Sequence, residues 1–260
     1  MQRVRPKKHL GQHFLNDSSI ATRIVDSLDV NSSSSVLEVG PGMGVLTGML
    51  LKRYDDRFYA AEVDAESVEY LKKHFVNLGD RLMGVDFLRM DLSSVSTTSL
   101  AIIGNFPYNI SSQILFKVLD NRNLITKVVG MMQREVAQRI AHGPGSKVYG
   151  ILSVLLQAFY EVEYLFTVSS GVFTPPPKVQ SAVVRLTRNS TQSLGCDEAL
   201  FFRVVKLAFN QRRKTIRNSI KSIINTSAPE GPYLNMRPEQ LSVGQFVQLT
   251  QWLQENRPGE

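Results

Sequence analysis

The sequence is poor in cysteine, in histidine and in long hydrophobic runs. Cys196 is the single cysteine among 260 residues, so no disulfide can form within the chain, and a reducing cytoplasm is the expected setting. No apolar run approaches the roughly 20 residues that a membrane span requires, and the basic residues 1–8 lead into no hydrophobic signal region. No metal is expected either, because the 4 histidines show no ligand spacing.

The composition is that of a globular protein with a basic surface. A chain of 260 residues with 43% hydrophobic content can bury one sizeable core and a small second domain. The formal net charge is +7 and the pI is near 9.5, which indicates a polyanionic partner such as nucleic acid.

The tetrapeptide Asn105-Phe106-Pro107-Tyr108 follows an apolar stretch, residues 100–104, that reads as a strand. An Asn side-chain oxygen and a backbone carbonyl can each accept a hydrogen bond from an exocyclic amine, which directs its lone pair at an electrophile. The tyrosine offers a face on which a flipped base can stack. The pattern therefore favours methylation of a nitrogen on a planar ring. The alternative is an ordinary turn, since Asn and Pro are common turn formers.

A glycine loop lies upstream of this tetrapeptide. Residues 36–39 read as a buried strand, Gly40-Pro41-Gly42-Met43-Gly44 as a loop and residues 45–54 as a helix. Glycines there let the backbone approach a ligand closely. Carboxylates follow at the next two strand ends: Glu62 can hold ribose hydroxyls, and Asp86 can bind an adenine amine. This order of elements indicates a site for S-adenosylmethionine.

Strands and helices alternate along the first part of the chain, which predicts an α/β fold with a mainly parallel sheet covered by helices. Two late strands, residues 162–168 and 179–187, are expected to form an antiparallel edge. Residues 189–195 are polar and lack periodicity. The predicted domain boundary lies there, between a methyltransferase domain with a basic N-terminal arm, residues 1–188, and a small all-α domain, residues 189–260.

The C-terminal part has three apolar faces at helical spacing: the first is Leu200, Val204, Leu207 and Ala208, the second Ile216, Ile220, Ile223 and Ile224, and the third Val243, Phe246, Leu249 and Leu253. A basic stripe accompanies the isoleucines and is predicted to contact RNA phosphates: Arg212, Arg213, Lys214, Arg217 and Lys221. The alternative for such a stripe is a solvated helix face.

Several segments, spread over nearly the whole chain, match one family. They are LGQHFLND at 10–17, EVGPG at 38–42, GNFPYNIS at 104–111, QREVA at 133–137, VFTPPPKV at 172–179 and FNQRRK at 209–214. Through them the chain closely resembles the rRNA adenine dimethyltransferases of the small ribosomal subunit. The resemblance implies a Rossmann-like S-adenosylmethionine-dependent methyltransferase fold.

The resemblance also implies roles for individual residues. Cofactor contacts are expected at His13, Leu15, Gly40, Gly42, Glu62, Asp86 and Asn105. The family usually has Asn where this chain has His13. Catalytic roles are expected for Asn105 and the Pro107 carbonyl, which orient the amine, and for Tyr108 and Phe173, which sandwich the target base. Phe173 is alternatively a core residue.

The implied reaction dimethylates the N6 amines of two adjacent adenosines near the 3′ end of small-subunit rRNA. S-adenosylmethionine is the methyl donor and leaves as S-adenosylhomocysteine, without a metal. The implied partner is a partly assembled small ribosomal subunit, and the protein is expected to act as a cytoplasmic monomer with no membrane partner.

Three alternatives remain open from the sequence. A sister enzyme that methylates large-subunit rRNA and confers antibiotic resistance shares the Asn-x-Pro-Tyr and Phe-x-Pro elements, although Gln211-Arg212-Arg213-Lys214 favours the small subunit. A ribosome-assembly binding factor can use the same fold without needing its activity. A DNA adenine methyltransferase shares the tetrapeptide chemistry, but no segment resembles a sequence-reading domain.

Overall fold

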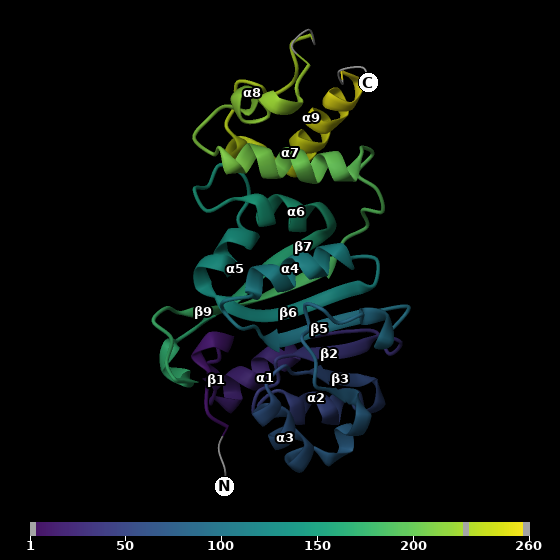
Figure 1. The fold of residues 1–260 in the computed structure, drawn as a ribbon, viewed down its shortest axis with the longest axis vertical. Helices are drawn as coiled ribbons and strands as arrows, with labels where there is room; N and C mark the ends of the chain where they lie inside the picture. Colours follow the sequence, from purple (N-terminus) through teal and green to yellow (C-terminus); the bar gives the residue numbers. More distant parts are fainter. Residues whose placement is uncertain (1–3, 226–228, 257–260) are drawn as a thin grey trace. The chain divides into compact units, whose positions relative to one another are not determined.

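The computed structural model describes residues 4–225 and 229–256, and the chain divides into two compact units (Figure 1). The first unit comprises residues 1–137 and 161–188, and the second comprises residues 138–160 and 189–260. The second unit thus contains a segment, residues 138–160, that precedes the end of the sheet in sequence.

A seven-stranded sheet, in the order β4-β3-β2-β5-β6-β9-β7, forms the centre of the first unit. The strands are β2 (Ser35–Val39), β3 (Phe58–Ala61), β4 (Leu82–Met83), β5 (Leu100–Asn105), β6 (Ile125–Gln133), β7 (Tyr160–Val168) and β9 (Ser181–Arg188). The pairs from β4 through to β6 are parallel, whereas β9 runs antiparallel to β6. Central strands of such a sheet are covered on both faces, which explains why residues 100–104 are apolar or glycine and fully buried.

The helices of the first unit follow the strands. They are α1 (Ser18–Asp26), α2 (Thr47–Tyr54), α3 (Ala65–His74), α4 (Ser111–Asp120) and α5 (Arg134–Ala141), the last of which continues into the second unit. Short 3-10 helices join them: η1 (Lys8–Leu10), η2 (Asp55–Arg57), η3 (Val76–Arg81), η4 (Leu92–Ser94) and η5 (Ser170–Val172). Asp17 and Asp64 cap α1 and α3 by accepting backbone N–H bonds, which satisfies donors that have no partner inside a helix.

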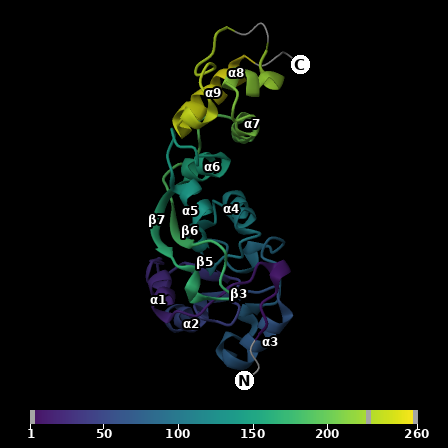
Figure 2. The same cartoon turned by 90° about the vertical axis from the view of Figure 1, so that its left-hand side faces the viewer.

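One buried cluster of the first unit packs helices α1 and α2 against this sheet. Residues of α1 and α2, such as Ile24 and Leu50, join Val129 and Met131 of β6 in one buried cluster. The helix α4 lies on the opposite side of the sheet from α1 (Figure 2). A separate two-stranded ladder pairs β1 (Phe14–Leu15) with β8 (Phe173–Thr174) in antiparallel register. This ladder ties the N-terminal arm, residues 4–16, to the segment that links β7 and β9.

The second unit is helical. It consists of α6 (Ile151–Phe159), α7 (Glu198–Asn210), α8 (Ile216–Ser219), η6 (Lys221–Ile223), η7 (Pro238–Gln240) and α9 (Val243–Glu255). The first and third predicted apolar faces lie in α7 and α9, where Val204, Ala208, Phe246 and Leu249 are fully buried. No helix among the described residues is long and apolar enough to span a membrane.

The prediction that the second apolar face lies on one continuous helix is wrong. The helix α8 ends at Ser219, and a 3-10 turn follows at Lys221–Ile223. Ile216 and Ile220 are buried, whereas Ile223 and Ile224 are half-buried. The residues between the isoleucines, Asn218 and Ser219 among them, are weak helix formers, so spacing alone predicts too much helix here.

Candidate active site

An open cavity lies at the carboxyl ends of the parallel strands β2, β3 and β5. The register pairs Glu38 of β2 with Ala60 of β3 and Ile103 of β5, so these strands end at the same edge of the sheet. Every residue predicted to contact the cofactor lines this one cavity: His13, Leu15, Gly40, Gly42, Glu62, Asp86 and Asn105. Ligand sites of open parallel sheets form at such edges.

The glycine loop after β2 forms one wall of the cavity and requires its glycines. Gly40 and Gly42 have φ of 70° and 58°, a region that other residues rarely adopt. A Cβ atom at Gly42 would lie 2.9 Å from Cε1 of Phe14, closer than packed carbon atoms come. The Phe14 ring of the N-terminal arm therefore packs directly against the loop backbone at Gly42.

Glu62 stands at the end of β3 with its side chain almost completely buried, at 4% exposure. Its Oε2 accepts a hydrogen bond from the Gly42 N–H at 3.0 Å, and its Oε1 accepts one from the Asp64 N–H at 2.9 Å. Burial raises the pKa of the Glu62 carboxyl, while these backbone hydrogen bonds oppose the shift. Each carboxylate oxygen can accept a second hydrogen bond, so Glu62 keeps acceptor capacity for ligand hydroxyls.

Glu38 also lines the cavity, a role that its sequence pattern did not predict. Its side chain is 1% exposed, and the Thr47 hydroxyl donates to its Oε2 at 2.7 Å. Burial raises the pKa of Glu38 to about 8, with the hydrogen bond from Thr47 opposing the shift and the nearby Glu62 adding to it. The signal in the sequence was a charged residue inside an otherwise apolar strand.

The predicted catalytic loop follows β5. The Asn105 Nδ2 donates to the His13 carbonyl at 2.8 Å, which leaves the Oδ1 of Asn105 as an acceptor. The Pro107 carbonyl accepts the Ile110 N–H at 3.2 Å, which occupies one of its two lone pairs. The loop thus presents two oxygen acceptors, Asn105 Oδ1 and the Pro107 carbonyl, from residues that both line the cavity.

The buried side chain of Phe106 fixes the position of this loop on the sheet. Its side chain is 1% exposed and packs over two strand glycines, Gly104 and Gly130. A Cβ atom at Gly130 would lie 2.3 Å from Cε2 of Phe106, so no side chain fits there. The ring and the glycine together set the depth at which Asn105 enters the cavity.

The two predicted base-stacking residues occupy different environments. Tyr108 lines the cavity, its hydroxyl forms a hydrogen bond with the Ser181 hydroxyl, and its ring centroid lies 5.2 Å from that of His13. Phe173 is 3% exposed, belongs to the buried core cluster and pairs with Leu15 across the β1–β8 ladder. In this structure Tyr108 is therefore at the cavity and Phe173 is packed in the core.

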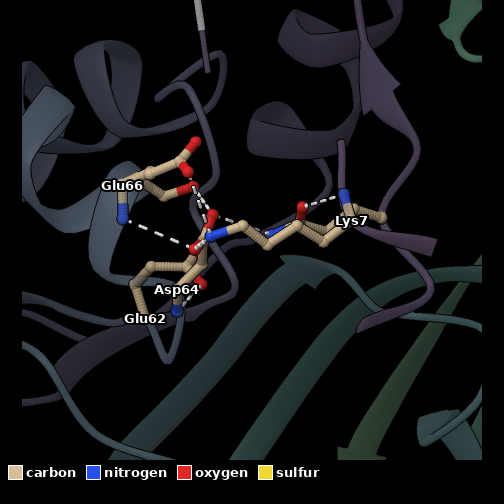
Figure 3. A network of polar contacts seen from close by, with 6 residues as sticks. Lys7, Glu62, Asp64 and Glu66 are labelled. Atoms are coloured by element: carbon tan, nitrogen blue, oxygen red, sulfur yellow. Dashed lines mark hydrogen bonds and ion pairs between the residues drawn. The ribbon is translucent and has the colours of Figure 1, made fainter. Parts of the chain in front are cut away.

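The N-terminal arm is anchored beside Glu62 by a network of polar contacts (Figure 3). The Lys7 ammonium forms an ion pair with Asp64 and lies 3.6 Å from the Glu66 carboxylate. The Gln12 side chain accepts the Lys7 N–H at 2.8 Å and donates to Asp64 at 3.4 Å. Burial raises the pKa of Asp64, but hydrogen bonds from the Lys7, Ser67 and Gln12 side chains outweigh burial and hold this pKa below its usual value. Lys7 thus anchors the N-terminal arm to Asp64, and the arm forms one wall of the cavity.

Two apolar residues at the cavity were also missed by sequence reasoning. Val63 and Leu88 line it, and the Val63 side chain is 56% exposed although it is hydrophobic. Each stands within two positions of a predicted cofactor carboxylate, Glu62 or Asp86. Their positions, one residue after Glu62 and two residues after Asp86, were the available signal.

The five basic residues of the second unit are not equivalent. Arg212 donates to the Ser146 carbonyl at 3.2 Å and lies 4.0 Å from the Glu239 carboxylate, and Arg217 forms an ion pair with Glu230. Arg217 is nevertheless exposed, as are the other three residues, Arg213, Lys214 and Lys221. The first three basic residues follow the end of α7 and precede α8, so the predicted stripe does not run along one helix.

The sheet order and the polar groups at its strand ends define a Rossmann-like S-adenosylmethionine-dependent methyltransferase. The family model described as ribosomal RNA adenine dimethylase matches residues 3–255, and the chain belongs to this family. The fold class and the family predicted from the sequence are thereby confirmed.

Two curated relatives are similar over nearly their whole length. Ribosomal RNA small subunit methyltransferase A of Parabacteroides distasonis is 58% identical over 252 residues, which cover 96% of this chain and 94% of the relative. The protein of the same name from Bacteroides thetaiotaomicron is 56% identical over 258 residues, with 98% and 96% covered. These similarities bear out the prediction of an rRNA adenine dimethyltransferase.

Two solved structures share the fold. A dimethyladenosine transferase from Plasmodium falciparum superposes with a TM-score of 0.80 at 23% identity, covering 94% of this chain and 98% of the other. The 23S rRNA methyltransferase ErmE superposes with a TM-score of 0.72 at 25% identity, covering 93% and 99%.

Proposed function

We propose that this protein transfers methyl groups from S-adenosylmethionine to the N6 amines of two adjacent adenosines near the 3′ end of small-subunit rRNA. The observation that carries the proposal is the hydrogen bond from Asn105 Nδ2 to the His13 carbonyl, which commits Oδ1 of Asn105 to the role of acceptor. An acceptor in this position beside an aromatic ring suits a flipped adenine.

The residues present fit the proposed cofactor. Glu62 has acceptor capacity for ribose hydroxyls, and Asp86 can accept from the adenine amine. Val63 and Leu88 offer apolar surface for the purine ring, and Gly40 and Gly42 line the same cavity. When bound, S-adenosylmethionine supplies a methyl group made electrophilic by the positive sulfonium, and S-adenosylhomocysteine leaves.

The residues of this chain act on the target base by orientation. Asn105 Oδ1 and the Pro107 carbonyl each accept a hydrogen bond from the adenine amine, which turns its lone pair toward the methyl group. Tyr108 stacks on the base after it has left its helix. The predicted second stacking residue, Phe173, is buried in this structure, and its contact with the base stays a prediction.

The proposed partner is rRNA within a partly assembled small ribosomal subunit. We assign catalysis to residues 1–188 and rRNA contact to residues 189–260, whose exposed basic residues Arg213, Lys214 and Lys221 suit phosphate groups. The basic net charge of +7 supports a nucleic-acid partner. The setting of such a reaction is the cytoplasm, and we expect a monomer that uses no metal.

The test is methyl incorporation into purified, unmethylated small subunits, large subunits and mature naked rRNA. Mass spectrometry then identifies the modified nucleotides. Dimethyladenosine at adjacent sites in small-subunit RNA is the expected product. Methylation confined to large-subunit RNA would instead place the protein with the resistance enzymes, and methylation of none of the three substrates would favour an assembly factor.

A further inference from the structure

Lys117 of α4 holds the segment between β4 and η4, residues 84–91, by two hydrogen bonds. Its ammonium donates to the Leu88 carbonyl at 3.1 Å and to the Met90 carbonyl at 2.6 Å. The ammonium also lies 5.5 Å from the ring centroid of Phe87, which is buried. Two carbonyls and one ring of the same short segment thus surround a single lysine head group.

The segment that Lys117 holds belongs to no strand or long helix. It is stabilised from within by turn hydrogen bonds, from the Leu88 N–H to Asp86 Oδ1 at 2.9 Å and from the Arg89 N–H to the Asp86 carbonyl at 3.0 Å. Bonds of this kind define the shape of a turn, but they do not fix where the turn lies relative to the sheet. Lys117 supplies such an external tie, because it comes from a different element.

The segment carries two residues of the cavity, Asp86 and Leu88. The helix that carries Lys117 begins at Ser111, directly after the catalytic loop that contains Asn105. Lys117 therefore connects the loop that orients the target amine with the segment expected to hold the adenine of the cofactor. Burial lowers the pKa of Lys117, and the neighbouring carboxylates of Asp86 and Asp91 oppose that shift.

We propose that Lys117 is a positioning residue for the adenine end of the cofactor site. By fixing the Leu88 and Met90 carbonyls, it holds the Asp86 carboxylate where that group accepts a hydrogen bond from the adenine amine. This inference rests on the proposed function, because it assumes that Asp86 faces the adenine of S-adenosylmethionine. It goes beyond that proposal in assigning a role to a side chain that does not line the cavity.

The experiment compares two ligands that differ at the group facing Asp86. S-adenosylhomocysteine has an amine at position 6 of its purine, whereas S-inosylhomocysteine has a carbonyl there, which cannot donate to a carboxylate. Isothermal titration calorimetry gives the affinity of each ligand for the full chain. The wild-type protein is expected to prefer the adenosyl ligand by at least about tenfold, the loss typical of a missing hydrogen bond to a charged group.

The Lys117→Met variant is expected to lose most of this preference. Its affinity for the adenosyl ligand should fall about tenfold while its affinity for the inosyl ligand stays within about twofold, because one misplaced hydrogen bond is at stake. In methyl-transfer assays the KM for S-adenosylmethionine should rise while kcat stays within about twofold, because the catalytic loop is unchanged. Lys117→Arg, which can also donate to two carbonyls, should restore a large part of the preference.

A matched control separates positioning from general stabilisation. Lys127 of β6 also donates to a backbone carbonyl, that of Asp29, and does not line the cavity. Lys127→Met should leave the ligand preference intact. If Lys117→Met weakens both ligands equally, or keeps the wild-type preference, the positioning role is overturned. If it does not fold, Lys117→Gln and Lys117→Arg decide between the same outcomes.

The outcomes also distinguish this inference from the proposed function. A wild-type protein that methylates small-subunit rRNA but binds both ligands equally overturns the role of Asp86 and with it that of Lys117. Absence of methyl transfer, by contrast, overturns the proposed reaction whatever the ligand preference is.

Discussion

The Asn105 side-chain amide donates to the backbone carbonyl of His13, 92 residues earlier in the chain, at 2.8 Å. An amide group has a donor end and an acceptor end, so this bond decides which end is left for the substrate. The N-terminal arm, anchored through Lys7 and Asp64, thus determines the orientation of the predicted catalytic side chain. The same short segment therefore forms one wall of the cavity and orients the amine acceptor Asn105, which belongs to the loop after β5.

The first prediction tests the acceptor role of Asn105. Asn105→Ala should reduce methyl transfer about 10²-fold or more, because an oriented hydrogen bond that matters most in the transition state is lost. The fold should be retained, as measured by circular dichroism and thermal unfolding. Radiolabelled methyl incorporation into small subunits gives the rate.

A neighbouring asparagine provides the control for this prediction. Asn109 Nδ2 also donates to a carbonyl of the arm, that of His9, at 3.2 Å. If the loss in Asn105→Ala came from loosening the arm, Asn109→Ala should lose a similar amount. Near-normal turnover in Asn105→Ala would contradict the assigned role.

The second prediction concerns Phe173 and Tyr108. Phe173→Ala should lower the free energy of unfolding by about 3–5 kcal/mol, because the ring is 3% exposed in the core. Tyr108→Ala should instead weaken RNA binding or turnover by roughly 1–3 kcal/mol, since a stacking surface is lost. Chemical denaturation and steady-state kinetics separate the two effects.

Conservative variants isolate the aromatic faces. Tyr108→Phe keeps the ring and loses only the hydrogen bond to Ser181, so turnover should stay close to normal. Phe173→Leu keeps an apolar side chain in the core. Full methyl transfer by Phe173→Leu would contradict the predicted stacking of Phe173 on the base.

The third prediction concerns the pH dependence of stability. The folded-state pKa of Glu38 is raised from 4.5 to about 8, so between these values the folded state binds a proton that the unfolded state has released. The stability that this proton contributes is fully present below the unfolded pKa and is lost as the pH rises toward 8, at no more than about 1.4 kcal/mol per pH unit. Glu62, whose pKa is also raised, contributes in the same direction.

Glu38→Gln removes this titration. The variant should resemble the wild type near pH 5 and become the more stable of the two as the pH approaches 8, in urea denaturation of the ligand-free protein. Gln can still accept the hydrogen bond from Thr47. Parallel pH profiles for the two proteins would show that Glu38 is ionised in the folded state.

The fourth prediction separates the basic residues of the second unit. Replacing Arg213, Lys214 and Lys221 together by glutamine should reduce the slope of log affinity against log salt for small-subunit RNA by up to about one unit per lost phosphate contact. Cofactor affinity and thermal stability should not change. Arg212→Gln should behave differently and lower stability, because the Ser146 carbonyl and Glu239 lose their partner. The opposite pattern would assign RNA contact to Arg212.

The sequence predicted the parts of the site that depend on strand ends. Glu62, Asp86 and Asn105 each follow a predicted strand, and parallel strands bring their carboxyl ends to one edge. Alternation of strands and helices was likewise enough for the fold class, and the family resemblance added the arm residues His13 and Leu15.

The parts that could not be predicted depend on contacts between distant elements. Lys7 reads as one more basic residue of the arm until the fold places it beside Asp64, and Lys117 reads as a polar position of a helix. The burial of Phe173 depends on the β1–β8 ladder. Each strand of this ladder is two residues long, which is too short to produce a periodic pattern in the sequence. Local pattern does not contain such information.

The packing of Phe106 on Gly130 also constrains how this chain can diverge from its relatives. Because a Cβ atom at Gly130 would lie 2.3 Å from the Phe106 ring, a larger residue at position 130 is compatible only with a smaller one at position 106. The two positions are expected to change together during evolution, although one lies in the loop after β5 and the other on β6. A substitution at position 130 that is harmless in a homologue with a smaller residue at position 106 would then displace Asn105 in a homologue that has Phe there. Loss of catalysis can therefore arise from a residue outside the catalytic loop.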